Sequence, residues 1–394
     1  MKRVLILLMG LILTAGGLEV LSFLALQLRP TGNPLAYPSR EASLHFYRPS
    51  NGWLFFEVKP RHTQRYRRDE FDTSVRTNNI GLREDVDFDG RADIGFVGDS
   101  FTFGHGVDVG ERYSDRVRQR LPGMAVWSYA DANGYAPPHY LLFLKNNPQF
   151  VPKTLVVGLF PWNDLRHDVT DMVFERDARG DIVAIRSASQ RIGSEGFLLG
   201  AEAAEQEPVW RRLMREFNLG RVVLLAQYRL SALLRARASP APAATSPSTA
   251  ADHVSIDHGA FNADALTSLT ALQEIARLVR DRGGDVVIFF IPTSYMVGTY
   301  PYFCETLDGY DAQSCSRFRQ ENPLGLALQA WARAHCLDLI DPTQDFRARE
   351  QQGSRLYFAK DGHWTPAGHA AAADLIVDYL AQRPSRACSG PEAR

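Results

Sequence analysis

Short apolar runs, separated by longer segments with a helical repeat, make up most of the chain after residue 90. The runs predict buried strands at residues 94–97, 125–128, 154–159, 286–291 and 337–340. The segments between and after them predict helices near residues 113–121, 138–146, 263–282, 324–335 and 366–381. Strands that alternate with helices in this way indicate an α/β domain with a mostly parallel sheet.

The N-terminus carries a different pattern, a nearly unbroken apolar run over residues 4–28 behind the basic residues Lys2 and Arg3. A bilayer span needs about 20 apolar residues, and a basic flank favours an N-terminus on the cytoplasmic side. Ala15 and the two glycines after it resemble a signal-peptidase site, but the apolar run continues beyond them. An uncleaved, single-pass anchor in the inner membrane is therefore favoured over a cleaved signal, with the α/β domain in the periplasm.

Polar and low-complexity segments set the remaining boundaries. After the anchor (1–29) comes a polar, turn-rich lead-in segment (30–90), then the α/β domain (91–384) and a short tail (385–394). The domain contains a long insertion at 166–260, with a predicted hairpin near 176–181 and an amphipathic helix over 208–234. Its Ala/Pro/Ser-rich stretch at 237–251 predicts a mobile linker. We expect the insertion to form a cap, or a surface for an envelope protein partner.

Charge and cysteine content narrow the function. The formal net charge is −1, so nothing favours nucleic acid as a partner, and a small or carbohydrate substrate fits better. The four cysteines suit an oxidising compartment. Cys304 and Cys315 lie close in sequence and are predicted to form a disulfide, which leaves Cys336 and Cys388 as a possible second pair. Spacing alone does not settle the connectivity.

Ser100 follows the first predicted core strand in the turn Gly98-Asp99-Ser100. The carboxyl ends of parallel strands are where such sheets hold ligands, so Ser100 is a candidate nucleophile. A serine hydroxyl needs a base and an orienting acid, and His363 and Asp361 lie two residues apart on one late loop. The alternative is that Ser100 only caps a helix or forms a turn.

Together these stretches resemble the SGNH (GDSL) hydrolase superfamily of esterases, lipases and O-acyltransferases. The resemblance rests on Gly98-Asp99-Ser100, Asn133-Gly134-Tyr135, Asn163-Asp164 and the late Asp361 and His363, in that order. Most members of the superfamily space the late pair Asp-x-x-His. The Asp-x-His-Trp spacing in this chain resembles the alginate O-acetylation branch instead.

The resemblance implies a three-layer α/β/α, flavodoxin-like fold and a Ser100–His363–Asp361 triad. It also implies an oxyanion hole made by the backbone N–H groups of Ser100 and Gly134 and the side-chain amide of Asn163, because donors must point at the developing negative charge. It implies no cofactor and no metal. Substrate-binding residues are not identifiable from the sequence.

The leading hypothesis is a membrane-anchored, extracytoplasmic serine esterase or O-acyltransferase that acts on a cell-envelope or exported polysaccharide, with acetyl as the expected acyl group. One alternative is an esterase for lipids or small esters. The other is an inactive glycan-binding or scaffold protein of the envelope that has kept the fold. The sequence does not distinguish water from a sugar hydroxyl as the acyl acceptor.

Overall fold

The computed structural model describes residues 2–28, 33–50, 52–131, 135–165, 172–187, 190–192, 196–200, 208–238, 267–300, 304 and 312–382. Its centre is a 5-stranded sheet with strand order β13-β12-β7-β5-β6, in which every neighbouring pair is parallel. The strands are β5 (Ile94–Val97), β6 (Val126–Ser128), β7 (Thr154–Leu159), β12 (Asp285–Phe290) and β13 (Asp338–Ile340). All five were predicted, with bounds that differ by at most one residue.

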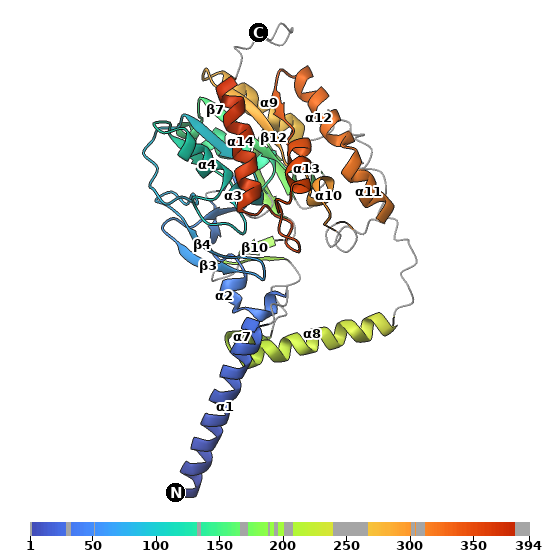
Figure 1. Cartoon of the computed structure of the whole chain (residues 1–394). Helices are drawn as coiled ribbons and strands as arrows, with labels where there is room; N and C mark the ends of the chain where they lie inside the picture. The colour runs from blue at the N-terminus through green and yellow to red at the C-terminus, as the bar shows by residue number, and fades with distance from the viewer. Residues whose placement is uncertain are drawn as a thin grey trace.

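Helices cover both faces of this sheet (Figure 1). Alternate residues of β12 face opposite ways, so Ile288 packs in one hydrophobic cluster with α5 (Pro137–Asn146) and α9 (Thr267–Arg280). Its neighbour Phe289 packs in a second cluster with α4 (Tyr113–Arg120) and α14 (Pro366–Gln382). Strands buried on both faces need continuous apolar runs, which explains the sequence pattern. The predicted three-layer α/β/α fold is confirmed.

Further helices lie before and after β13, and short helical turns join the larger elements. The sequence predicted α12 (Pro323–Ala334) but missed α11 (Ala312–Gln320) and α13 (Thr343–Gln351). The short turns are η1 (Pro34–Ala36), α2 (Ser39–Ala42), α3 (Ser100–Phe103), η2 (Pro148–Phe150), α6 (Pro161–Asp164) and α10 (Ser294–Val297).

The lead-in segment forms two antiparallel strand pairs that pack on the α/β domain. They are β1 (Tyr47–Pro49) with β2 (Phe56–Val58), and β3 (Thr63–Arg67) with β4 (Asp72–Arg76). Phe46, Phe56 and Tyr66 are buried in the same hydrophobic cluster as α5 and α9. The lead-in therefore shares the core of the α/β domain, while the domain limits themselves remain a prediction.

The insertion begins with the predicted hairpin, β8 (Met172–Arg176) and β9 (Ile182–Ser187), and a second strand pair follows, β10 (Gln190–Ile192) and β11 (Leu198–Gly200). The single helix predicted over 208–234 is wrong, because the chain forms α7 (Val209–Glu216) and α8 (Asn218–Ala238) with an extended residue, Phe217, between them. A Cβ on Gly220 would lie 2.1 Å from the Met214 carbonyl oxygen, so the close packing of the two helices requires glycine there. Of the predicted linker, residues 239–251 lie outside the described residues.

Helix α1 (Lys2–Leu28) projects from the rest of the molecule and contacts α8 (Figure 1). It is long and apolar enough to serve as a membrane anchor or as a signal sequence.

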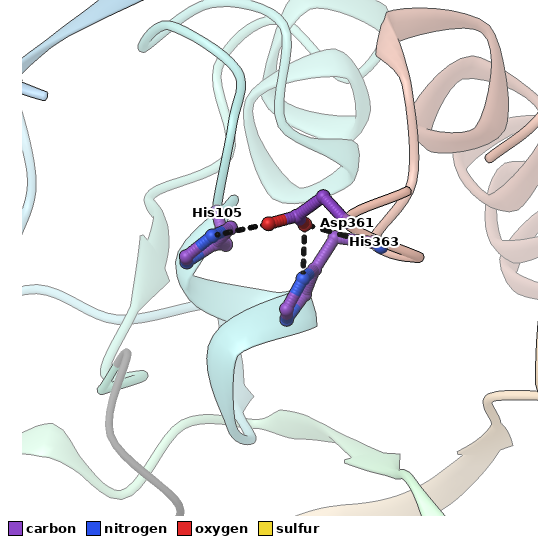
Figure 2. Close-up of side chains that lie close together, drawn as sticks. All are labelled: His105, Asp361 and His363. Atoms are coloured by element: carbon purple, nitrogen blue, oxygen red, sulfur yellow. Dashed lines mark hydrogen bonds and ion pairs between the residues drawn. The ribbon is translucent and has the colours of Figure 1, made fainter. Parts of the chain in front are cut away.

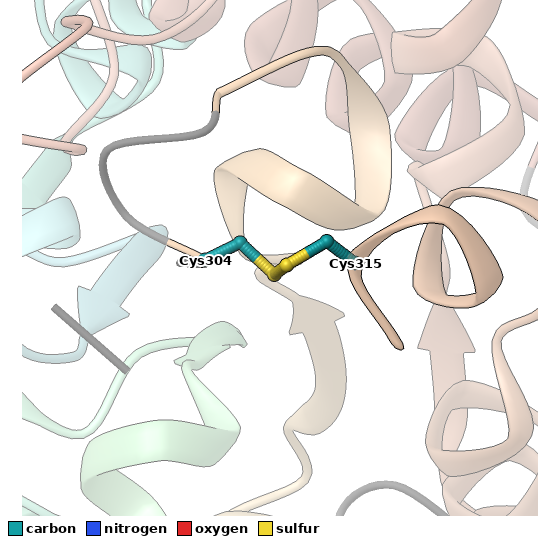
Figure 3. Close-up of a disulfide and its surroundings, with 2 residues drawn as sticks. All are labelled: Cys304 and Cys315. Carbon is teal, nitrogen blue, oxygen red and sulfur yellow. A yellow bond between two sulfur atoms is a disulfide. The ribbon is translucent and has the colours of Figure 1, made fainter. Parts of the chain in front are cut away.

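A disulfide joins Cys304 and Cys315, with a Cα–Cα distance of 5.9 Å (Figure 3). It ties the segment after α10 to α11, and the predicted pairing is confirmed. Cys336 is also disulfide-bonded, whereas Cys388, the other member of the possible second pair, lies outside the described residues.

Candidate active site

Ser100 is the first residue of α3, directly after β5. The cap of this helix is Asp99, whose carboxylate accepts a hydrogen bond from the Phe101 N–H at 3.0 Å. Gly98 has to be glycine, because a Cβ there would lie 1.9 Å from the Thr102 Oγ1 atom. The capping role considered for Ser100 thus belongs to Asp99, and the Ser100 hydroxyl is available for other contacts.

Those contacts form a chain of hydrogen bonds. The Ser100 Oγ atom lies 2.7 Å from His363 Nε2, and His363 Nδ1 lies 2.6 Å from Asp361 Oδ1. Ser100 lies just after β5, while the other two residues come from the loop before α14, where Gly362 has a φ of 81°. Three side chains from opposite ends of the chain therefore meet at the carboxyl edge of the sheet, in the order that a nucleophile, a base and an orienting acid require.

A second histidine, His105, completes this cluster (Figure 2). Its Nε2 atom lies 3.3 Å from Asp361 Oδ2, and its ring stacks on His363 with centroids 4.1 Å apart. Burial, and then the neighbouring His363, lowers the pKa of His105 to about 4, so its imidazole is neutral at pH 7. The sequence analysis did not single out His105, because no local pattern links it to Asp361, which lies 256 residues away.

The two imidazoles determine the charge state of the acid between them. Burial alone raises the pKa of Asp361, but the interactions with His105 and His363 outweigh it, and the net pKa lies well below the ordinary value. Asp361 is therefore a carboxylate at neutral pH, which is the form that can stabilise a protonated His363.

The lead-in segment holds both halves of this cluster. The carboxylate of Glu70 accepts hydrogen bonds from the backbone N–H groups of Ala359, Lys360 and Asp361, at 2.7, 2.8 and 2.8 Å. The guanidinium of Arg83, which is fully buried, donates to backbone carbonyls of the turn at 103–107 that carries His105. No local pattern indicated either role, because both contacts join residues that are distant in the chain.

The remaining predicted site residues are less completely described. Gly134 lies outside the described residues. Asn163 lies in α6, which follows β7, and β7 is the neighbour of β5 in the sheet. The backbone of Asn163 therefore follows a strand at the same edge as Ser100, as the sequence predicted, and the role of its amide stays a prediction.

One group of described side chains has the composition of a metal site, namely His105, Asp361 and His363, whose ligand atoms lie within 4.8 Å of one another. Those atoms already bond to each other and to Ser100. An ion would have to break the hydrogen-bonded chain, so we assign no metal here. Two pockets lined by described residues, of about 440 and 470 Å³, include neither Ser100 nor His363 in their walls, and no substrate contact is assigned to them.

Comparisons with known proteins bear on this arrangement. Residues 257–393 match the family described as "SGNH hydrolase-like domain, acetyltransferase AlgX". This match covers the last third of the chain, including Asp361 and His363 but not Ser100. A search of curated proteins finds no match.

Solved structures with some likeness include a member of the lipolytic G-D-S-L family from Veillonella parvula, at 10% identity over 74% of this chain and 99% of that one, with a TM-score of 0.35. Another is a catalytic mutant of Axe2, an acetylxylan esterase from Geobacillus stearothermophilus. It is 13% identical over 75% of this chain and 97% of that one, with a TM-score of 0.34. These values are too low to carry an argument about function. The family match confirms the resemblance to the SGNH hydrolases and to their alginate O-acetylation branch.

Proposed function

We propose that the protein is a membrane-anchored serine esterase or O-acyltransferase that works outside the cytoplasm on the O-acetyl groups of a cell-envelope or exported polysaccharide. The observation that carries the proposal is the hydrogen-bonded chain from Ser100 through His363 to Asp361. The match to an acetyltransferase family supports acetyl as the acyl group.

The geometry supports a two-step reaction. In the first step the Ser100 Oγ atom attacks the carbonyl carbon of an acetyl ester while His363 Nε2 takes the hydroxyl proton. Asp361, held as a carboxylate, stabilises the imidazolium that forms. The tetrahedral intermediate collapses as His363 returns the proton to the departing alcohol oxygen, which leaves acetyl-Ser100.

In the second step a hydroxyl group attacks the acetyl-enzyme, and the same histidine acts first as base and then as acid. Water as the acceptor makes the protein an esterase, and a sugar hydroxyl makes it a transferase. In both steps the negative charge on the carbonyl oxygen would be stabilised by the Ser100 N–H, and we assign the other donors to the Gly134 N–H and the Asn163 amide. One such donor is worth about 3 kcal/mol in the barrier.

The proposed location of the enzyme rests on α1. Every large apolar side chain between Val4 and Leu13 is more than half exposed, so none of the described residues covers this stretch. We assign α1 to the inner membrane as an uncleaved anchor, with the α/β domain in the periplasm.

The test is mass spectrometry of the intact purified chain after incubation with an activated acetyl ester. We expect one acetyl group on the wild-type protein and none on Ser100→Ala or His363→Ala, because the two residues act as a unit. Adding candidate polysaccharides should then shorten the lifetime of the acetyl-enzyme if the protein is a transferase. A wild-type chain that is never acetylated, or a Ser100→Ala chain that is acetylated equally, would favour the scaffold hypothesis.

A further inference from the structure

Helix α7 has one apolar face and one basic face, and the apolar face is open. Val209, Trp210 and Leu213 lie on one side of the helix and are 71%, 48% and 56% exposed. The opposite side carries Arg211, Arg212 and Arg215. A short helix with an aromatic apolar face and a cationic polar face is the form that lies in the interface of a lipid bilayer.

Helix α8, which packs against α7, has an exposed apolar stripe of its own. Val223, Leu230, Leu233 and Leu234 recur at a helical spacing that places them on one side of α8, and they are 38%, 59%, 62% and 55% exposed. Leu224 and Leu225, on other sides of the helix, are buried. None of the described residues covers this stripe. Single exposed leucines are common on protein surfaces, but a regular row of them on one helix face indicates a binding surface.

The anchor fixes where this surface lies relative to a membrane. Glu19 of α1 accepts hydrogen bonds from the first backbone N–H groups of α8, those of Asn218 and Leu219, the latter at 2.9 Å. A carboxylate inside an apolar run is costly unless it is paired, and the N-terminus of a helix is a favourable partner for it. The start of α8 is thereby held at the level of Glu19.

This level is close to the outer boundary of a bilayer. From Val4 to Glu19 the helix rises about 22 Å, at 1.5 Å per residue, and the hydrocarbon core is about 30 Å thick. Figure 1 shows α8 crossing the upper part of α1 at a steep angle, with the α/β domain on the side away from the N-terminus. The start of α8 is then about 8 Å inside the outer edge of the hydrocarbon, a depth that interfacial helices reach, and the steep crossing angle directs α8 along the membrane.

We propose that α7 and α8 lie in the outer interface of the membrane, with Val209, Trp210 and Leu213 of α7 and Leu230, Leu233 and Leu234 of α8 among the acyl chains. Arg211 and Arg212, the exposed arginines of α7, lie at anionic headgroups. This inference rests on the proposed anchoring by α1 but not on the proposed chemistry. The two helices give the enzyme a second contact with the membrane, which keeps its domain at a fixed height and tilt. A protein partner on this surface is the alternative that the experiment separates.

The experiment uses the full chain in nanodiscs of phosphatidylcholine and phosphatidylglycerol, with plain or brominated acyl chains that quench nearby tryptophans. The chain has 6 tryptophans, so Trp210 is assigned by difference with Trp210→Phe. We expect brominated lipid to quench the wild-type protein and to have much less effect on Trp210→Phe. In the Trp210→Phe background, Leu230→Trp should restore quenching.

The matched control is Leu326→Trp in the same background, because Leu326 is 68% exposed but lies on α12 of the α/β domain. It should not be quenched. If Trp210 and the tryptophan of Leu230→Trp respond no more than this control, the surface does not contact lipid and the inference is wrong. A chain that is not retained in nanodiscs would overturn the anchoring and this inference together, while the acetyl-enzyme measurement would still test the chemistry.

Discussion

Replacing His105 by phenylalanine should lower activity. It should also make the protein lose less stability than wild type when the pH is lowered. The phenyl ring keeps the stacking surface for His363 but removes the Nε2 contact to Asp361 Oδ2. A hydrogen bond to a charged group contributes about 1.5–3 kcal/mol, and this one, at 3.3 Å, belongs at the lower end. We therefore expect kcat to fall about 10-fold with little change in KM, since about 1.4 kcal/mol corresponds to one factor of ten.

At low pH the wild-type His105 lowers the stability of the folded protein, so its removal is favourable there. His105 has an ordinary pKa of 6.5, which burial lowers to about 4 in the folded protein, and its side chain is only 13% exposed. Between these values the unfolded chain binds a proton that the folded chain does not, so stability falls as the pH falls from 6.5 to 4. The full cost is about 3 kcal/mol, of which about 2 kcal/mol is present at pH 5.

The His105→Phe variant lacks this group. The difference between its melting temperature and that of wild type should therefore be about 4 °C more favourable to the variant at pH 5 than at pH 7.5, at about 2 °C per kcal/mol for a chain of this size. Thermal unfolding of both full chains in the same detergent, followed by near-UV circular dichroism, measures the difference. His105→Gln keeps a donor for Asp361 and should recover part of the lost kcat. An unchanged kcat in His105→Phe, or a melting difference that is the same at both pH values, would refute this account of His105.

Three other changes test the surroundings of the site. Asp361→Asn keeps the shape but removes the carboxylate that stabilises the imidazolium, so hydrolysis of an activated acetyl ester should drop by about 10⁴-fold and remain measurable. Glu70→Gln leaves one acceptor oxygen for three N–H groups and should loosen the 359–361 loop. Amide hydrogen exchange at 359–361 should then be faster than in wild type while α14 is unchanged, and kcat should fall about 10-fold. Converting Cys304 and Cys315 together to serine opens a loop with a sequence separation of 11, and should lower the free energy of unfolding by about 2–3 kcal/mol without changing kcat, which denaturant titration and the ester assay would measure.

The sequence determined the sheet and much of the candidate site because both have local signals. Strands buried on two faces require uninterrupted apolar runs, so the five core strands are visible one by one. Ser100 directly follows such a strand, and Asp361 and His363 stand two residues apart. Short-range patterns of this kind can be recognised without any knowledge of the fold. For this reason the sequence alone predicted the side chains that meet at the carboxyl edge of the sheet.

Only the tertiary structure decided which distant residues support that edge. Glu70 and Asp361 are 291 residues apart, and His105 and Asp361 are 256 apart, so no periodicity could link them. The break between α7 and α8 has the same origin, because the first N–H groups of α8 donate to Glu19 of α1, which lies 199 and 200 residues earlier. Local patterns specify elements through their own periodicity, whereas the contacts that position a loop or divide a helix come from whatever the fold brings alongside.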